Sequence, residues 1–140
     1  MPASTALANA WLQNLLNGVA MPVAFTGTNC YVSLHTADPG DAGTQATSEI
    51  AYTGYARLPI VRNTTGGWTV SGKGAVNAAA ALFGTMTGGA GGTVTYLCIG
   101  ELLTGTGTIF ARGSISPTIS VTTGVAPNFP STTGIVWAIT

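Results

Sequence analysis

Charged residues are scarce in this sequence of 140 residues. Four Lys or Arg and four Asp or Glu make up 6% of the chain, whereas charged residues are typically about a quarter of a globular domain. The formal net charge is zero, so the chain has no basic field for the phosphates of a nucleic acid, and we expect no direct nucleic-acid binding. A surface with so little charge suits a chain that packs into a neutral assembly.

The residues of common catalytic and metal sites are equally scarce. The chain has one histidine, His35, and two cysteines, Cys30 and Cys98, none of them in a CxxC or Cys/His cluster of the kind that binds zinc. The cysteines lie in apolar, strand-like runs and could form a disulfide. We favour two buried free thiols, because assembly inside a cell keeps thiols reduced. We expect no metal ion and no cofactor.

Long apolar runs are absent as well. The longest, Ala78 to Phe83, is far shorter than the roughly 20 residues that a membrane-spanning helix needs. No Lys or Arg precedes Arg57, so the positively charged start of a signal peptide is missing. We expect neither secretion nor membrane insertion.

Residues that favour strands and turns are abundant. The chain has 20 glycines, and its many Thr, Val and Ile residues favour pleated, half-buried strands. Short segments of this kind, separated by turn residues, predict a mainly β fold, an antiparallel sandwich or small jelly-roll-like barrel. The length suits a single domain over residues 1–140. The expected strands are 30–36, 52–62, 68–70, 75–83, 93–100, 109–115, 117–121 and 134–139.

Two of these strands carry further expectations. Pro59 cannot donate a ladder hydrogen bond, so the strand that contains it should be bulged or lie at a sheet edge. The segment 75–83 is rich in alanine, which favours a helix, but Val76 and the flanking glycines allow the strand that we favour.

The N-terminal segment of about residues 4–17 has the pattern of a helix. Ser4 can act as its N-cap, and Asn17-Gly18 can stop it. An apolar stripe with roughly four-residue spacing consists of Leu7, Trp11, Leu15 and Leu16. This stripe must be buried against something. We expect the helix to matter more for assembly than for folding, by docking on a neighbouring protein. The alternative is that it covers its own sheet.

A serine hydrolase would need His35 as a general base beside a serine. Ser33 lies on the same face of the strand, and Ser48 follows in the next loop. Neither serine has a nucleophile-elbow sequence around it, and Asp38-Pro39-Gly40 is explained as a turn. We therefore predict that the protein is not an enzyme.

Two further segments could bind ions. Asp38, Asp41 and Glu49 offer oxygen ligands for Ca²⁺, but their spacing does not match a calcium loop, so we interpret them as solvated turn residues. The glycine-rich segment 88–92 precedes a strand rather than a helix and lacks the Lys-Ser/Thr of a phosphate-binding loop. We interpret it as a mobile loop.

Three of the few charges are arginines in strand-like segments: Arg57, Arg62 and Arg112. Arginine is enriched at protein interfaces, where its guanidinium binds carboxylates with two hydrogen bonds. The alternative is pairing within the chain, with Glu49 or Glu101. Together with the helix, these residues form the predicted partner interface: Leu7, Trp11, Leu15, Arg57, Arg62 and Arg112.

The order of segments resembles a family of tailed-phage virion structural proteins, often labelled tail-fibre proteins. After the short helix, the resemblance rests on the segments 31–36, 37–43, 48–49, 52–57 and 92–96, with Ile99. It covers nearly the whole chain, although Cys98 and Glu101 depart from the pattern. No catalytic residue carries over from the family.

The resemblance implies a component of the phage particle, assembled in the host cytoplasm. Similar small β modules are cement or decoration proteins that stabilise the capsid as trimers. A compact chain without a fibrous repeat favours this function, with the major capsid protein and further copies of itself as partners on the capsid surface. The alternative is a protein of the tail or of a tail fibre.

Overall fold

The structure is a computed structural model that describes residues 1–22 and 25–138. It is mainly β, with one helix near the N-terminus, and every pair of neighbouring strands is antiparallel. The elements are α1 (Thr5–Asn17), β1 (Asn29–His35), β2 (Leu58–Val61), β3 (Trp68–Ser71), β4 (Gly74–Asn77), β5 (Ala81–Leu82), β6 (Gly92–Gly100), β7 (Ile109–Val121), β8 (Asn128–Phe129) and β9 (Val136–Ala138). The predicted fold class is confirmed.

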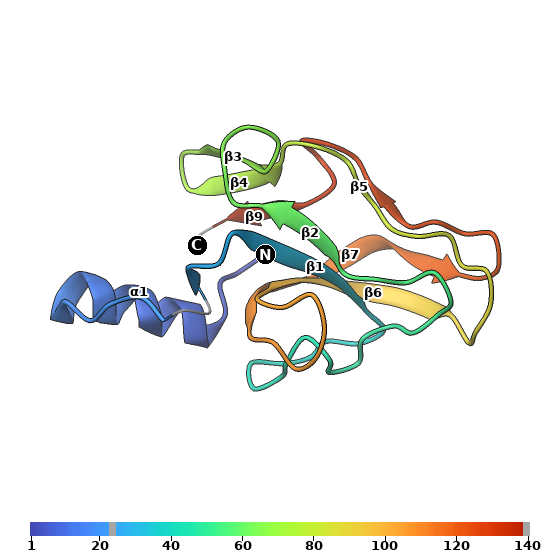
Figure 1. Ribbon diagram of the computed structural model, residues 1–140, viewed down its shortest axis with the longest axis horizontal. Coiled ribbons are helices and arrows are strands. Elements are labelled where there is room, and N and C mark those ends of the chain that lie inside the picture. The colour runs from blue at the N-terminus through green and yellow to red at the C-terminus, as the bar shows by residue number, and fades with distance from the viewer. Residues whose placement is uncertain (23–24, 139–140) are drawn as a thin grey trace.

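The described strands form three sheets. The largest has the order β2-β1-β6-β7, and the two smaller ones are β3-β4-β9 and β5-β8. The smaller sheets lie on one side of the four-stranded sheet, as Figure 1 shows. The core between them is filled from the large sheet by Val32, Leu34, Leu97 and Ile99 and from the opposite side by Phe83, Phe129 and Ile135. The described strands therefore form a sandwich and do not close into a barrel.

Two strand predictions depended on special residues, and both are confirmed. Pro59 lies in β2, which pairs only with β1 and is the outer strand of its sheet, so its missing N–H leaves no ladder bond unmade. The alanine-rich segment 75–83 is extended rather than helical, but it divides into β4 and β5 with a bend at Ala78 and Ala79.

Apart from one-residue shifts at strand ends, the strands differ from the prediction in four respects. The expected strand 52–62 shortens to β2 (Leu58–Val61), because residues 52–57 belong to the preceding loop, where the Tyr55 and Arg57 side chains bind Glu49. The segments 109–115 and 117–121 form one continuous strand, β7, which passes a register irregularity opposite Thr95 of β6. β8 was not expected. β9 begins at Val136 rather than Gly134, and Ile139, the last residue of the expected strand, lies outside the described residues.

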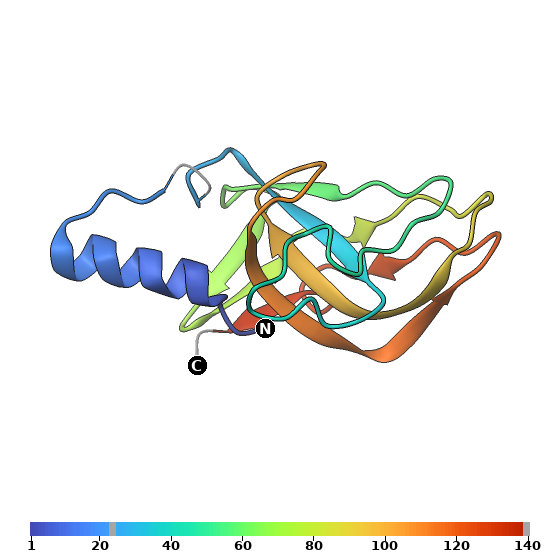
Figure 2. The same ribbon diagram turned by 90° about the horizontal axis from the view of Figure 1, so that it is seen from below.

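The helix begins and ends as its sequence predicts. Ser4 Oγ accepts a hydrogen bond from the Leu7 N–H, and Gly18 ends the helix with a left-handed φ of 65°. The Ser4 N–H donates to the Phe110 carbonyl of β7 (2.6 Å), which ties the start of α1 to the large sheet. Beyond this anchor the helix projects from the sheets (Figure 2).

Candidate functional site

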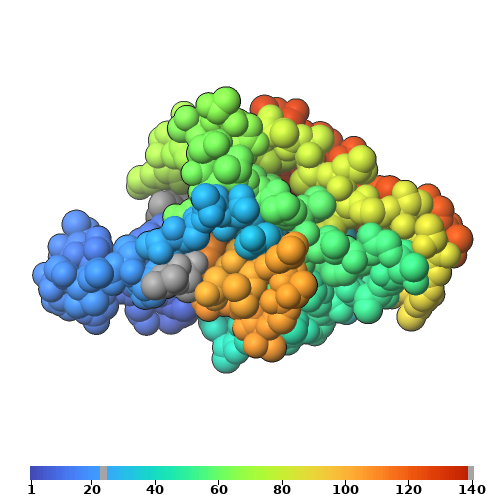
Figure 3. Space-filling view, in the orientation of Figure 1, coloured from blue at the N-terminus to red at the C-terminus, as the bar shows by residue number. Residues whose placement is uncertain are grey.

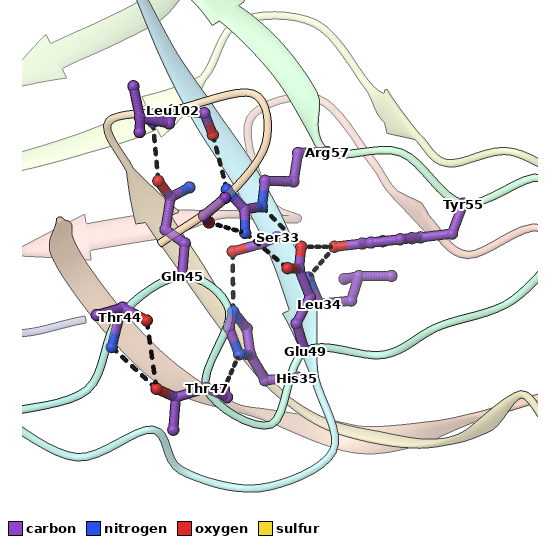
Figure 4. Close-up of polar contacts among 11 residues, drawn as sticks. Ser33, Leu34, His35, Thr44, Gln45, Thr47, Glu49, Tyr55, Arg57 and Leu102 are labelled. Atoms are coloured by element: carbon purple, nitrogen blue, oxygen red, sulfur yellow. Dashed lines mark hydrogen bonds and ion pairs between the residues drawn. The ribbon is translucent and has the colours of Figure 1, made fainter. Parts of the chain in front are cut away.

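A buried cluster of polar side chains joins the end of β1 to the loop that follows it. We call this cluster, which consists of Ser33, His35, Gln45, Glu49, Tyr55 and Arg57, the polar centre (Figure 4). It contains the residues that a hydrolase would use, so its geometry decides what chemistry the chain can offer.

His35 is fully buried and both ring nitrogens have partners. Nδ1 lies 2.8 Å from the Thr47 carbonyl oxygen, and Nε2 lies 2.8 Å from Ser33 Oγ. Because a carbonyl only accepts, Nδ1 carries the proton and Nε2 accepts from the Ser33 hydroxyl. Burial lowers the pKa of His35, so the ring is held neutral.

The expected contact between Ser33 and His35 is therefore present, but it lacks two features of a nucleophilic pair. Neither side chain is exposed to solvent, and the His35 Nδ1 faces a backbone carbonyl rather than a carboxylate. The other candidate serine, Ser48, is exposed, and no hydrogen bond joins it to His35 among the residues that the structure describes. The contacts of His35 with Ser33 and with the Thr47 carbonyl therefore fit a structural role, in which they hold the segment 37–57 against β1.

Arg57 and Glu49 form the charged part of the polar centre. Arg57 Nε donates to Glu49 Oε1 (2.7 Å) and Arg57 Nη2 to Glu49 Oε2 (2.6 Å), a bidentate pair. The guanidinium also donates to the carbonyls of Leu102 (3.1 Å) and Gly105 (2.7 Å). Arg57 is only 4% exposed. Of the two alternatives left open by the sequence, the structure selects the intrachain pair, with Glu49 rather than Glu101.

Tyr55 connects the ion pair to β1. Its hydroxyl donates to Glu49 Oε1 (2.7 Å) and accepts from the Leu34 N–H (3.1 Å). Burial is the main cause that raises the pKa of Tyr55, so the hydroxyl keeps its proton. Glu49 is thus bound from two sides, by Arg57 and by Tyr55.

Gln45 completes the polar centre and joins two loops. It is fully buried. Its side-chain Oε1 accepts from the Leu102 N–H (2.8 Å), and its backbone N–H donates to the Gly107 carbonyl (2.9 Å). A Cβ at Gly100 or Gly107 would overlap the Gln45 side chain. The segment 37–57 and the loop 101–108 are therefore fastened together.

Two further acidic residues, Asp38 and Asp41, are bound to Arg112 near the surface. Arg112 Nε donates to Asp38 Oδ1 (2.7 Å) and Arg112 Nη1 to Asp41 Oδ1 (2.7 Å). The Gly40 N–H and Arg112 lower the pKa of Asp38. The three carboxylates considered as calcium ligands are thus all paired with arginines, and the described residues contain no group of three that could hold a metal ion.

The glycine-rich segment 88–92 and the two cysteines were also considered in the sequence, and their surroundings in the structure indicate structural roles. The Thr53 N–H donates to the Gly88 carbonyl (2.8 Å), which attaches the glycine-rich segment to the segment 37–57 between β1 and β2. Cys30 and Cys98 are both buried and free. Burial raises the pKa of Cys98 to about 12 and also raises that of Cys30, so both are poor nucleophiles.

The helix divides the predicted interface residues into a buried and an exposed group. Leu7 is buried in the chain's own core and Trp11 packs against that core, as the covering alternative expects. Leu15 is 79% exposed. We call the exposed apolar side chains at the end of the helix the helix-end surface: Leu12, Leu15, Leu16 and Val19. Figure 3 shows this end of α1 standing clear of the rest of the molecule.

A second apolar surface lies at the base of the helix. Two adjoining hollows share Val70, Ala75 and Trp137, which are cross-strand neighbours in the three-stranded sheet. We call them the tryptophan groove, and its lining includes Trp11, Trp68, Val70, Lys73, Ala75 and Trp137. Arg62, whose Nη1 donates to the Gly27 carbonyl (2.9 Å), also borders the groove.

Sequence reasoning identified Glu49, Arg57 and His35 but missed Gln45, Tyr55 and the tryptophan groove. Gln45 and Tyr55 become polar anchors only when the 37–57 loop folds over β1, and the groove joins α1 to β3, β4 and β9 from distant parts of the chain.

No described helix is long and apolar enough to cross a membrane.

Comparison with known proteins supports a specific relationship. Residues 2–135 match the family model described as Podophage GP4 fiber I protein gp80. This match includes α1 and all the strands from β1 to β8. A search of curated proteins found no match.

Proposed function

The chain belongs to the podophage GP4 fiber I protein gp80 family of phage structural proteins, and we propose that it is a non-enzymatic component of the tail-fibre apparatus. The observation that supports this proposal most directly is the extent of the match, which covers residues 2–135 of 140. In this proposal the polar centre has a structural role, which is to hold the loops 37–57 and 101–108 in place.

The burial of the polar centre supports a structural role. Its serine and histidine are fully buried, and its arginine is satisfied by one carboxylate and two backbone carbonyls. A catalytic group must come within about 3 Å of the substrate atom on which it acts. Side chains that are closed off from solvent and bound to each other serve to hold the loops 37–57 and 101–108 in place.

The capsid cement function expected from the sequence fits the family less well than the alternative. The description of the matched family names a fibre protein and does not mention a capsid. We therefore place the tail-fibre alternative first. Binding to the major capsid protein would follow only from a location on the head.

Self-association is the second part of the proposal. Virion proteins commonly assemble with closed rotational symmetry, and we propose a homo-oligomer, with three copies as the expected number. The chain supports this by its net charge of zero, which gives copies little reason to repel one another.

Immunogold labelling of intact particles tests the location. Antibodies raised against the chain should label the tail or its fibres in negative-stain micrographs. Antibodies absorbed with the purified chain are the control and should label nothing. Gold confined to the head would overturn the tail-fibre proposal in favour of the cement function, and particles that lack the chain altogether would overturn both.

A further inference from the structure

The exposed end of α1 and the tryptophan groove are two separate apolar surfaces of the same chain. We propose that copies bind head to tail, with the helix-end surface of one copy lying in the tryptophan groove of the next. This inference deepens the proposed function, because it identifies the surfaces through which the chain would self-associate.

The helix-end surface is the stronger of the two pieces of evidence. Leu15 and Leu16 are 79% and 71% exposed, and the whole of α1 carries no charged residue. A helix at the surface of a monomer normally presents charged or polar side chains to water. Contiguous apolar side chains on a projecting element are typical of a surface that another protein covers.

The tryptophan groove has matching chemistry. Two of its lining residues, Trp11 and Trp137, are half-buried aromatic side chains, and Val70 on its rim is 72% exposed. Tryptophan in a partly open groove is typical of the central contacts of protein interfaces. An apolar helix is a common occupant of such a groove, since it inserts side chains at three- and four-residue spacing.

The charges of the two surfaces are complementary. The C-terminal end of a helix carries a partial negative charge from its last carbonyls, and α1 has no basic residue in its last turn to offset it. Lys73 lines the groove and Arg62 borders it. In the proposed contact these cations of one copy would face the helix end of the other.

The chain cannot make this contact with itself. Trp11 lines the groove, whereas Leu15 and Leu16 lie roughly 6–8 Å further along the same helix axis at 1.5 Å per residue. The helix therefore carries its exposed end away from the three-stranded sheet β3-β4-β9 whose residues line the groove; Figure 2 shows the helix extending away from the sheets. Because the two surfaces differ, each copy can give a helix and receive one, and the contacts close into a ring at a copy number set by their angle.

Light scattering coupled to size-exclusion chromatography tests this arrangement on the purified full chain. Wild type should be oligomeric, whereas L15D/L16D in the helix end and V70D in the groove should each be monomeric at the same concentration. All three changed side chains are highly exposed, so circular dichroism should show an unchanged fold. L82D, which changes an exposed leucine on β5 away from both surfaces, is the control and should assemble like wild type.

Mixing the two monomeric variants gives the decisive result. V70D retains an intact helix end and L15D/L16D retains an intact groove, so the mixture should form a one-to-one pair through one intact contact, at a concentration where neither variant associates alone. A monomeric wild type, variants that assemble normally, or a mixture without pairs would each overturn the head-to-tail contact. None of these results bears on particle location, which the labelling experiment tests separately.

Discussion

The indole rings of Trp11 and Trp137 lie nearly parallel, with centroids 6.3 Å apart and an interplanar angle of 12°. This contact joins the N-terminal helix to β9, near the other end of the chain. The two parts of the helix therefore have different surroundings. Trp11 packs against the chain's own core, and the turns that follow it extend into solvent.

Replacing Trp11 with alanine should therefore destabilise the fold. Trp11 is only half buried, so we expect a loss of about 2 kcal/mol, below the roughly 3–5 kcal/mol of fully buried aromatic truncations. Both substitutions are made in the V70D background, which we expect to be monomeric. Leu15→Ala is the matched control, and as a change of an exposed side chain in that monomer it should alter the free energy of unfolding by less than about 0.5 kcal/mol. Urea unfolding measures both. Equal effects of the two substitutions on the free energy of unfolding would contradict the difference between the packed part of the helix at Trp11 and its exposed end at Leu15.

Glu49→Gln should destabilise the protein strongly. It leaves the buried Arg57 guanidinium without its charge partner, and breaking a buried ion pair from one side typically costs about 3–5 kcal/mol. Asp41→Asn removes a carboxylate that is 69% exposed and leaves Arg112 its second partner, Asp38, so it should cost at most about 1 kcal/mol. Denaturant unfolding of both variants at neutral pH provides the comparison, and a Glu49→Gln variant as stable as Asp41→Asn would be evidence against a tightly held loop.

Acid should weaken the fold through His35. Burial lowers the pKa of His35 below the unfolded value of 6.5, so below that pH the unfolded chain binds a proton more readily than the native one. The stabilisation is fully present above pH 6.5 and is lost as the pH falls from there through the lower native pKa. His35→Gln should flatten this part of the curve. Urea midpoints measured between about pH 7.5 and 5 test it, and parallel curves for the two proteins would contradict it.

Cys30 and Cys98 should resist alkylation in the native protein. Both thiols are buried and their pKa values are raised, that of Cys98 to about 12, so little reactive thiolate is available. Iodoacetamide should add no mass to the folded chain and two carbamidomethyl groups after denaturation without reductant. A denatured chain that gains mass only after reduction would instead contain a disulfide.

Features that depend on short-range sequence patterns were predictable. Ser4 and Gly18 specify the helix ends through local backbone bonds, and Pro59 excludes a central strand because it lacks an N–H. The strand β8 was missed since Asn128–Phe129 is too short to show alternation. Its pairing with β5 depends on contacts between distant parts of the chain.

The partners of the arginines depend on tertiary structure. Arg112 and Asp38 are 74 positions apart, and they meet because β7 and the turn after β1 lie together in the folded chain. Glu49 was correctly considered for Arg57, but only the fold of the loop distinguishes it from Glu101, which accepts instead from the Thr108 N–H. Residue type therefore predicted carboxylate partners for Arg57 and Arg112 without specifying which, whereas Arg62 donates to the Gly27 carbonyl instead.

The pairing of charges within the chain affects how fast copies would meet. Five of the eight charged side chains bind one another, leaving Arg62, Lys73 and Glu101 as the others. Three unpaired charges produce little long-range attraction. Encounters between copies would therefore be governed by ordinary diffusion rather than by electrostatic steering. Rates of the proposed association should then fall in the unsteered range of about 10⁵–10⁶ M⁻¹s⁻¹ and change little with ionic strength, because short-range apolar contacts rather than screened fields would hold the copies together.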